Sequence, residues 1–320
     1  MGEALLNIRE LVVNFQTEAG TVRAVDGVSL GLNSGEIFGL VGESGCGKSV
    51  TALSILRLVP SPPGKIVSGN IFWKGKDLLK QSYQDLIGIR GKEIGMIFQE
   101  PLTSFNPVQK IGAQIGEVLQ IHTKLPLAEI KEKVLTALNR VGIADPERSY
   151  DAYPHELSGG MRQRAMIAMA LICNPQLLIA DEPTTALDVT IQAQILELLK
   201  DLQAENKMSV LMISHNLGII AEVAQRVAVM YAGKLVELAP VRDLFKNPLH
   251  PYTSGLLASI PKINQDAALT AIPGMIPDPL RLPEGCYFEP RCPKAMEVCK
   301  QRYPVEKEME AGHQVSCWLY

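Results

Sequence analysis

The sequence predicts an α/β fold in which a parallel sheet carries helices on its faces. Three short apolar runs, residues 36–41, 177–180 and 210–213, have the length and composition of buried strands. Segments with apolar residues at helical spacing separate these runs, and such alternation is typical of parallel sheets. The first run stops at glycines and leads into a helical pattern from Lys48 to Leu58, which Pro60 ends.

Length and composition indicate a globular chain of about two domains. Of the 320 residues, 47% are hydrophobic and 20% are charged, which is enough apolar material to bury a core. The net charge of −3 argues against a nonspecific nucleic-acid binder, because such proteins need a basic surplus. We find no membrane span and no secretion signal, so we expect a protein of the cytoplasm.

Two changes of pattern divide the chain. Between about residues 102 and 156, apolar residues recur at helical spacing with no strand among them, which predicts a helical subdomain inserted into the α/β domain. Beyond Phe245 the sequence becomes rich in proline and holds four of the six cysteines. We therefore predict one domain over residues 1–245 and a small, loop-rich domain over residues 246–320.

A phosphate-binding pattern follows the first predicted strand. Residues 42–49, GESGCGKS, fit G-x-x-x-x-G-K-[ST] between a strand and a helix. The glycines let backbone N–H groups cradle phosphates, while Lys48 reaches the β- and γ-phosphates and the Ser49 hydroxyl ligates Mg²⁺. We assign Cys46 no chemistry of its own. The predicted nucleotide-binding residues here are Gly42, Ser44, Gly45, Cys46, Gly47, Lys48, Ser49 and Val50.

Two acidic residues end the second predicted strand. Asp181 would hold Mg²⁺ through water, and Glu182 could act as the general base that polarises the attacking water. Paired acids after a strand are often only a solvated strand end. Following a phosphate-binding loop, they predict nucleotide hydrolysis.

The segment Leu157–Arg164, LSGGMRQR, resembles the LSGGQ motif of ATP-binding cassette (ABC) proteins, with Met161 where the family usually has Gln. The resemblance implies a RecA-like core with a β-rich N-terminal part and a helical subdomain. It also implies that Ser158 and Gly160 face the phosphate of a second subunit's site. Further residues match the family's motifs: Gln99 the Q-loop glutamine, residues 186–188 the D-loop and His215 the switch histidine. Gln99 would also take part in Mg²⁺ binding.

Phe15 matches the position at which the family stacks an aromatic ring on adenine. It also ends an alternating face with Leu11 and Val13, so a plain core residue is the alternative.

Two segments narrow the resemblance to the ATP-binding subunits of dipeptide and oligopeptide importers: residues 100–107 and residues 250–253, HPYT. This implies an ATPase at the cytoplasmic face of the membrane. Its partners would be two membrane-spanning permease subunits, a second ATPase subunit (this chain or a paralogue) and, indirectly, an extracytoplasmic peptide-binding protein. The alternatives are the same role in a nickel importer, or a soluble ABC ATPase outside transport.

Four cysteines crowd the C-terminal tail, Cys286-x5-Cys292-x6-Cys299-x17-Cys317. Four thiolates can hold an iron–sulfur cluster or zinc, although the tight C-x2-C pair of structural zinc sites is missing. The family resemblance implies a 4Fe–4S cluster; zinc, and free or disulfide-linked cysteines, remain alternatives. We expect His313 to be a solvated loop residue, and we expect the tail to depend on its metal site for its fold.

Overall fold

The structure is a computed structural model, and it describes residues 4–100, 104–185, 187–260 and 271–320. The described residues form two compact units, one within residues 1–80 and 212–320 and the other within residues 81–211. The tail therefore belongs to the same unit as the N-terminal strands. The predicted boundary after residue 245 stays a prediction.

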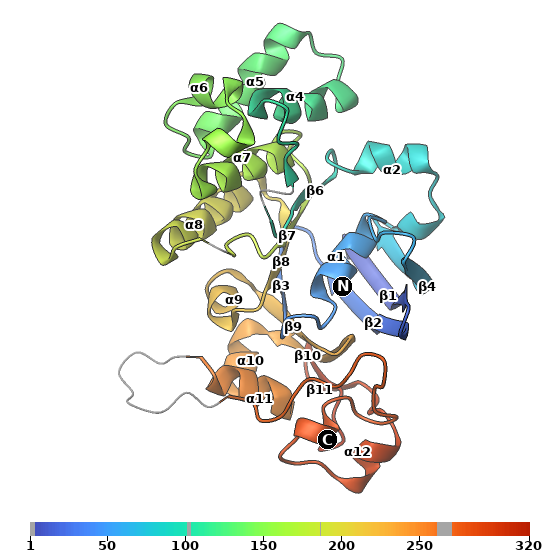
Figure 1. The fold of residues 1–320 in the computed structure, drawn as a ribbon. Helices are drawn as coiled ribbons and strands as arrows, with labels where there is room; N and C mark the ends of the chain where they lie inside the picture. Colours follow the sequence, from blue (N-terminus) through green and yellow to red (C-terminus); the bar gives the residue numbers. More distant parts are fainter. Residues whose placement is uncertain (1–3, 101–103, 186, 261–270) are drawn as a thin grey trace. The chain divides into compact units, whose positions relative to one another are not determined.

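The N-terminal part of the first unit is an antiparallel sheet. Strand β1 (Leu6–Thr17) lies between β2 (Gly20–Leu32) and β4 (Gly64–Trp73), and the short β5 (Lys76–Asp77) joins β4 (Figure 1). Side chains of β1 on one face are fully buried, namely Leu6, Ile8, Leu11 and Val13. Buried and more exposed side chains alternate over short stretches of this sheet, as expected when one face of a sheet packs on the core.

The phosphate-binding segment leaves a second sheet in the same unit. Strand β3 (Ile37–Val41) pairs in parallel with β9 (Arg226–Tyr231), which pairs antiparallel with β10 (Lys234–Pro240). All five residues of β3 are buried. Helix α9 (Leu217–Val223) packs so closely on this strand that a Cβ at Gly39 would lie 2.5 Å from the Ile220 Cγ2 atom.

The C-terminal tail extends this sheet. Strand β12 (His313–Val315) pairs antiparallel with β10 and with β11 (Lys307–Glu310), so the end of the chain adds two strands beside the cassette. The tail helices are α10 (Val241–Lys246), α11 (Pro251–Ala258) and α12 (Glu297–Gln301).

A buried carboxylate fixes the tail to β10. Glu237 accepts hydrogen bonds from the backbone N–H groups of Leu249 (2.8 Å) and His250 (2.9 Å), and its Oε1 atom lies 2.8 Å from His313 Nε2. The side chains of Glu237 and His313 are 0% and 2% exposed. The prediction of a solvated His313 was therefore wrong. The expectation that the tail depends on a metal site for its fold stays a prediction.

The second unit combines two parallel strands with a group of helices. Strand β6 (Ile94–Ile97) pairs in parallel with β7 (Leu177–Asp181). The described residues between 104 and 156 contain helices and no strand, as the predicted helical insertion requires; residues 102 and 103 lie outside the described part. The α-helices of this unit are α2 (Tyr83–Ile89), α4 (Ile111–His122), α5 (Leu127–Arg140), α6 (Pro146–Asp151), α7 (Gly159–Leu171) and α8 (Val189–Asn206).

Helix α5 shows how the helical pattern becomes packing. Its buried residues Ile130, Val134 and Leu138 recur every four positions and form one stripe along the helix. The third predicted strand is β8 (Ser209–Ser214), all of whose residues are buried; the sequence boundary between the two units falls within it.

Candidate nucleotide-binding site

The phosphate-binding loop has a backbone that only glycine tolerates. Gly47 precedes helix α1 (Lys48–Ile55) with φ 103°, and a Cβ there would lie 2.2 Å from the Ala24 carbonyl oxygen. A Cβ at Gly42 would lie 2.1 Å from the Met230 carbonyl oxygen. Both glycines therefore permit a close approach of backbone to backbone, which fixes the loop at the end of β3.

The ammonium group of Lys48 lies over this loop. The residue is 4% exposed, and its Nζ atom donates to the carbonyl oxygens of Gly42 (2.8 Å) and Glu43 (3.0 Å). This position places a positive charge and the N-terminus of α1 in the same loop, an arrangement that favours a bound phosphate.

Two other predicted residues of this unit, Cys46 and Phe15, differ from each other in burial. Cys46 is buried, and burial raises the pKa of its thiol, which agrees with assigning it no nucleophilic chemistry. Phe15 is half-buried, whereas Leu11 and Val13 on the same strand are fully buried. The Phe15 ring thus keeps an accessible surface that a core residue would lack.

The acidic end of β7 meets the Q-loop glutamine within the second unit. Asp181 is 4% exposed at the end of the strand, and Glu182 follows with a left-handed backbone, φ 49°. Glu182 Oε2 accepts hydrogen bonds from Gln99 Nε2 (3.3 Å) and Thr185 Oγ1 (2.9 Å). Two residues singled out from separate motifs are thus in contact, and both donors orient one carboxylate. A left-handed non-glycine residue is costly, and such strain is typical of functional sites.

Thr185 was not among the predicted site residues. Its position three residues after Glu182 could have indicated this contact, because a threonine hydroxyl can hydrogen-bond to the residue at the start of a turn.

The LSGGM segment begins helix α7. The Ser158 hydroxyl accepts a hydrogen bond from the Met161 N–H at 3.3 Å and caps the helix. Gly160 lies close to α8, because a Cβ there would lie 3.2 Å from the Ile191 Cγ2 atom. Ser158 and Gly160 line a cavity of about 690 Å³ in this unit, which offers the free end of the helix to a ligand.

The remaining motif residues are placed as follows. Asp188 of the D-loop caps α8 by accepting from the Ile191 N–H at 2.9 Å, while Ala186 lies outside the described residues. His215 is exposed and directly follows β8. In the segment 100–107, residues 101–103 lie outside the described part, and the Asn106 N–H donates to Gln114 Oε1 at 2.8 Å.

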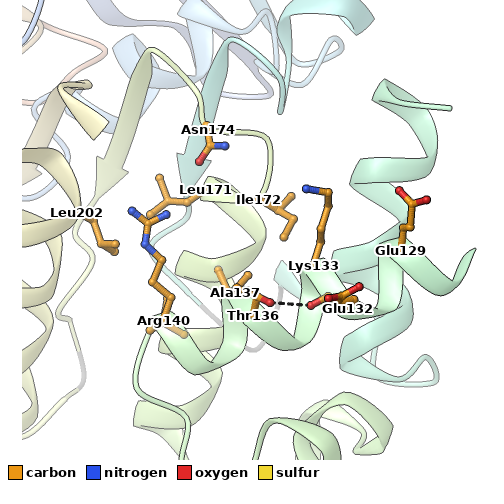
Figure 2. Close-up of a pocket in the computed structure, with 12 residues that line it drawn as sticks. Glu129, Glu132, Lys133, Thr136, Ala137, Arg140, Leu171, Ile172, Asn174 and Leu202 are labelled. Carbon is orange, nitrogen blue, oxygen red and sulfur yellow. Dashed lines mark hydrogen bonds between the residues drawn. The ribbon is translucent and has the colours of Figure 1, made fainter. Parts of the chain in front are cut away.

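A separate cavity of about 510 Å³ lies in the helical unit, between α5, the end of α7 and α8 (Figure 2). Charged side chains such as Glu129, Lys133 and Arg140 line it together with Leu171 and Leu202. None of the predicted nucleotide-binding residues lines it, so we assign no nucleotide to this cavity.

The four tail cysteines share one region of the first unit. Burial raises the pKa of Cys286 to about 12, and the neighbouring thiols of Cys299, Cys317 and Cys292 contribute to this rise. The Cys286 N–H donates to the Cys299 carbonyl oxygen at 2.7 Å. All four are free cysteines. Across the residues that the structure describes, no three His, Cys, Asp or Glu side chains form a group that could hold a metal ion.

Together, the glycine-rich loop before α1, the acidic end of β7 and the capped α7 define a P-loop ATPase cassette. Comparisons with known proteins agree. Residues 25–185 match the family described as ABC transporter, and residues 236–299 match the oligopeptide/dipeptide transporter C-terminal region. The structure is similar to that of the ATP-binding cassette MJ0796 bound to ADP and Pi, with TM-score 0.67 and 25% identity over 74% of this chain and 99% of that one.

Curated relatives cover almost the whole chain. The dipeptide transport ATP-binding protein DppD of Bacillus subtilis is 52% identical over 318 residues, which are 99% of this chain and 95% of the relative. The oligopeptide transport ATP-binding protein AppD of the same organism is 52% identical over 317 residues, 99% of this chain and 97% of the relative. The chain therefore belongs to the ABC transporter family, among the ATP-binding subunits with the oligopeptide/dipeptide C-terminal region, and the predicted fold class is confirmed.

Within the described ranges, none of the helices combines the length and apolar character needed to cross a membrane.

Proposed function

We propose that this chain hydrolyses ATP to power the import of dipeptides or oligopeptides through a membrane complex. The observation that carries the proposal is the joint occurrence of an ABC cassette and the oligopeptide/dipeptide C-terminal region in one chain. The relatives named for dipeptide and oligopeptide transport support it over 95% and 97% of their length. Two permease subunits, a second ATPase subunit and, indirectly, a peptide-binding protein would be its partners, at the cytoplasmic face of the membrane.

Within this function, each motif residue has a chemical role. The loop from Gly42 to Val50 binds the phosphates, Ser49, Gln99 and Asp181 hold Mg²⁺, and Phe15 stacks on adenine. Glu182 takes the proton of the attacking water, and its contacts with Gln99 and Thr185 hold the carboxylate in place. His215 contacts the γ-phosphate. Ser158 and Gly160, at the free end of α7, bind the nucleotide of the neighbouring subunit.

Cargo identity separates this proposal from a nickel importer. We expect the rate of ATP hydrolysis by the complete complex in lipid vesicles to rise when the peptide-binding protein is loaded with a dipeptide or oligopeptide mixture. The reason is that the transport cycle, and with it ATP turnover, requires bound cargo. The same assay with Ni²⁺ in place of peptide is the matched control. Stimulation by Ni²⁺ alone would contradict the peptide assignment and favour the nickel alternative. If the chain forms no complex with permease subunits, the result would favour a soluble ABC ATPase.

We also propose that Cys286, Cys292, Cys299 and Cys317 hold a 4Fe–4S cluster. Four soft thiolates select iron–sulfur or zinc over hard cations. Their shared location in the tail supports a common ligand, since each of the other three contributes to the pKa of Cys286. Zinc, or no metal, is the alternative.

Metal analysis tests the cluster directly. Anaerobically purified chain is expected to be brown and to contain about four iron and four sulfide per chain. Cys292→Ser is expected to remove the colour and most of the iron, whereas Cys173→Ser, a free cysteine outside the tail, keeps both. One zinc and no iron in protein from anaerobic cells would contradict the cluster.

A further inference from the structure

The second residue of the phosphate-binding loop is paired with the C-terminal tail. Glu43 Oε2 accepts a hydrogen bond from Arg291 Nη1 at 2.7 Å, and Glu43 Oε1 accepts one from Arg291 Nη2 at 3.1 Å. Two parallel bonds between a guanidinium and a carboxylate are among the strongest polar contacts in proteins. The pair joins residues 248 positions apart within one compact unit.

Arg291 is held in this position from several sides. Its side chain is 4% exposed, and its Nε atom donates to the Pro273 carbonyl oxygen at 3.1 Å. The guanidinium also lies 5.8 Å from the ring centre of Tyr231 and 6.0 Å from that of Phe288. Because the side chain is buried and multiply bonded, its charge stays beside the loop.

The tail also contacts the backbone of the loop. The Glu43 N–H donates to the hydroxyl of Tyr252 at 2.9 Å, and Tyr252 is fully buried. His250 places Tyr252 at the start of α11, because its Nδ1 atom accepts from the Tyr252 N–H at 3.1 Å. Burial lowers the pKa of His250 to about 3, so this ring is neutral and keeps its acceptor. The tail thus holds both the side chain and the backbone of Glu43.

We propose that Arg291 is a positioning residue for the nucleotide phosphates, and that it acts by neutralising and holding Glu43. The proposal deepens the function above and rests on the assignment of residues 42–49 to the phosphates. The Glu43 side chain is 26% exposed, and the backbone carbonyl oxygen of Glu43 accepts a hydrogen bond from Lys48 Nζ. A carboxylate at this place would repel a triphosphate. Paired with Arg291, it contributes little net charge, and the loop keeps the positive potential of Lys48 and α1.

The size of the effect follows from charge separation. An unscreened carboxylate within about 10 Å of a phosphate at a protein surface lowers affinity by about tenfold per charge. The effect should be larger for ATP than for ADP, because ATP carries one more phosphate. If the substitution only disrupted the loop structure, the loss of affinity would not depend on the charge of the nucleotide.

The test is a charge cycle on the full chain, with Kd values for ATP and ADP from titration calorimetry. Arg291→Gln is expected to weaken ATP binding about tenfold, because Glu43 is left unpaired. Glu43→Gln is expected to tighten it about threefold or more, because Arg291 is then uncompensated. The double variant is expected to return close to the parent value. Arg281→Gln, which removes the same charge from an exposed tail position, is the matched control.

Several outcomes would overturn the proposal. Arg291→Gln binding ATP as tightly as Arg281→Gln would do so, and so would a double variant as weak as Arg291→Gln, since the role would then be structural. If Arg291→Gln fails to fold in thermal denaturation, Glu43→Gln decides alone, and unchanged or weaker ATP binding refutes the charge account. Lys48→Ala distinguishes a failure of the phosphate-site assignment from a failure of the Arg291 proposal. If Lys48→Ala retains ATP affinity, the phosphate site itself is refuted. If Lys48→Ala loses ATP affinity while Arg291→Gln binds ATP normally, only the role of Arg291 is refuted.

Discussion

Replacing Glu182 with Gln is expected to lower the rate of ATP hydrolysis by about 10²–10⁴-fold, the range for loss of a general base. The change is nearly isosteric. The amide oxygen can still accept from Gln99 Nε2 and Thr185 Oγ1, the two donors that orient the carboxylate. What disappears is the ability to take a proton from water. ATP affinity should stay near the parent value, because Lys48 and the loop amides hold the phosphates. Single-turnover hydrolysis and nucleotide titration measure the two quantities separately.

The same variant should accumulate the ATP-bound state and reveal the paired form of the protein. With ATP, sedimentation is expected to show a dimer, because the γ-phosphate bridges the loop of one subunit and Ser158 and Gly160 of the other. Without nucleotide it should show a monomer. Glu197→Gln, an exposed substitution on α8, is the control and should hydrolyse ATP normally. Parent-rate hydrolysis by Glu182→Gln would refute the base assignment, and a persistent monomer would point to a paralogous partner.

Replacing Glu237 with Ala is expected to destabilise the first unit by about 3–5 kcal/mol, as the loss of one partner of a buried polar pair does. The Glu237 side chain is fully buried and accepts from the N–H groups of Leu249 and His250, and it contacts His313 Nε2. Alanine would leave these groups buried without their acceptor. Urea denaturation followed by circular dichroism gives the free energy of unfolding.

Two variants make this measurement specific. Glu237→Gln retains one acceptor oxygen and should cost clearly less than Glu237→Ala. Glu310→Ala, on the fully exposed strand β11, should change the free energy of unfolding by less than about 0.5 kcal/mol. If Glu237→Ala costs no more than Glu310→Ala, the buried carboxylate does not anchor the tail.

Elements whose cause is local were predictable from sequence. The apolar run before Gly42 and the run ending at Asp181 are buried strands, β3 and β7. A short, largely apolar segment bounded by turns suits the middle of a sheet. Ser158 caps α7, and a serine directly before an apolar helical stretch is a common N-cap. In each case the neighbours along the chain supply the physical reason.

Features that depend on distant partners were not predictable. His313 is buried because β12 pairs with β10, which brings it to a glutamate 76 residues away. Nothing in the residues around His313 indicates this burial. Arg291 and Glu43 likewise belong to different motifs, and only the fold of the tail brings them together. Gln99 and Glu182 could each be singled out because each lies in a motif of its own. Their contact was not foreseen, and their roles stay predictions.

The outermost strand of the tail has a consequence for solubility. In the first unit the order of strands runs β11-β12-β10-β9-β3, and all four residues of β11 are exposed, among them Lys307, Glu308 and Glu310. Charged side chains on an outer strand oppose the addition of a strand from another molecule. A cassette cut after residue 245 would lose this cover and present the hydrogen-bonding groups of β10 instead. We therefore expect the tail to reduce aggregation of the ATPase through its sheet edge.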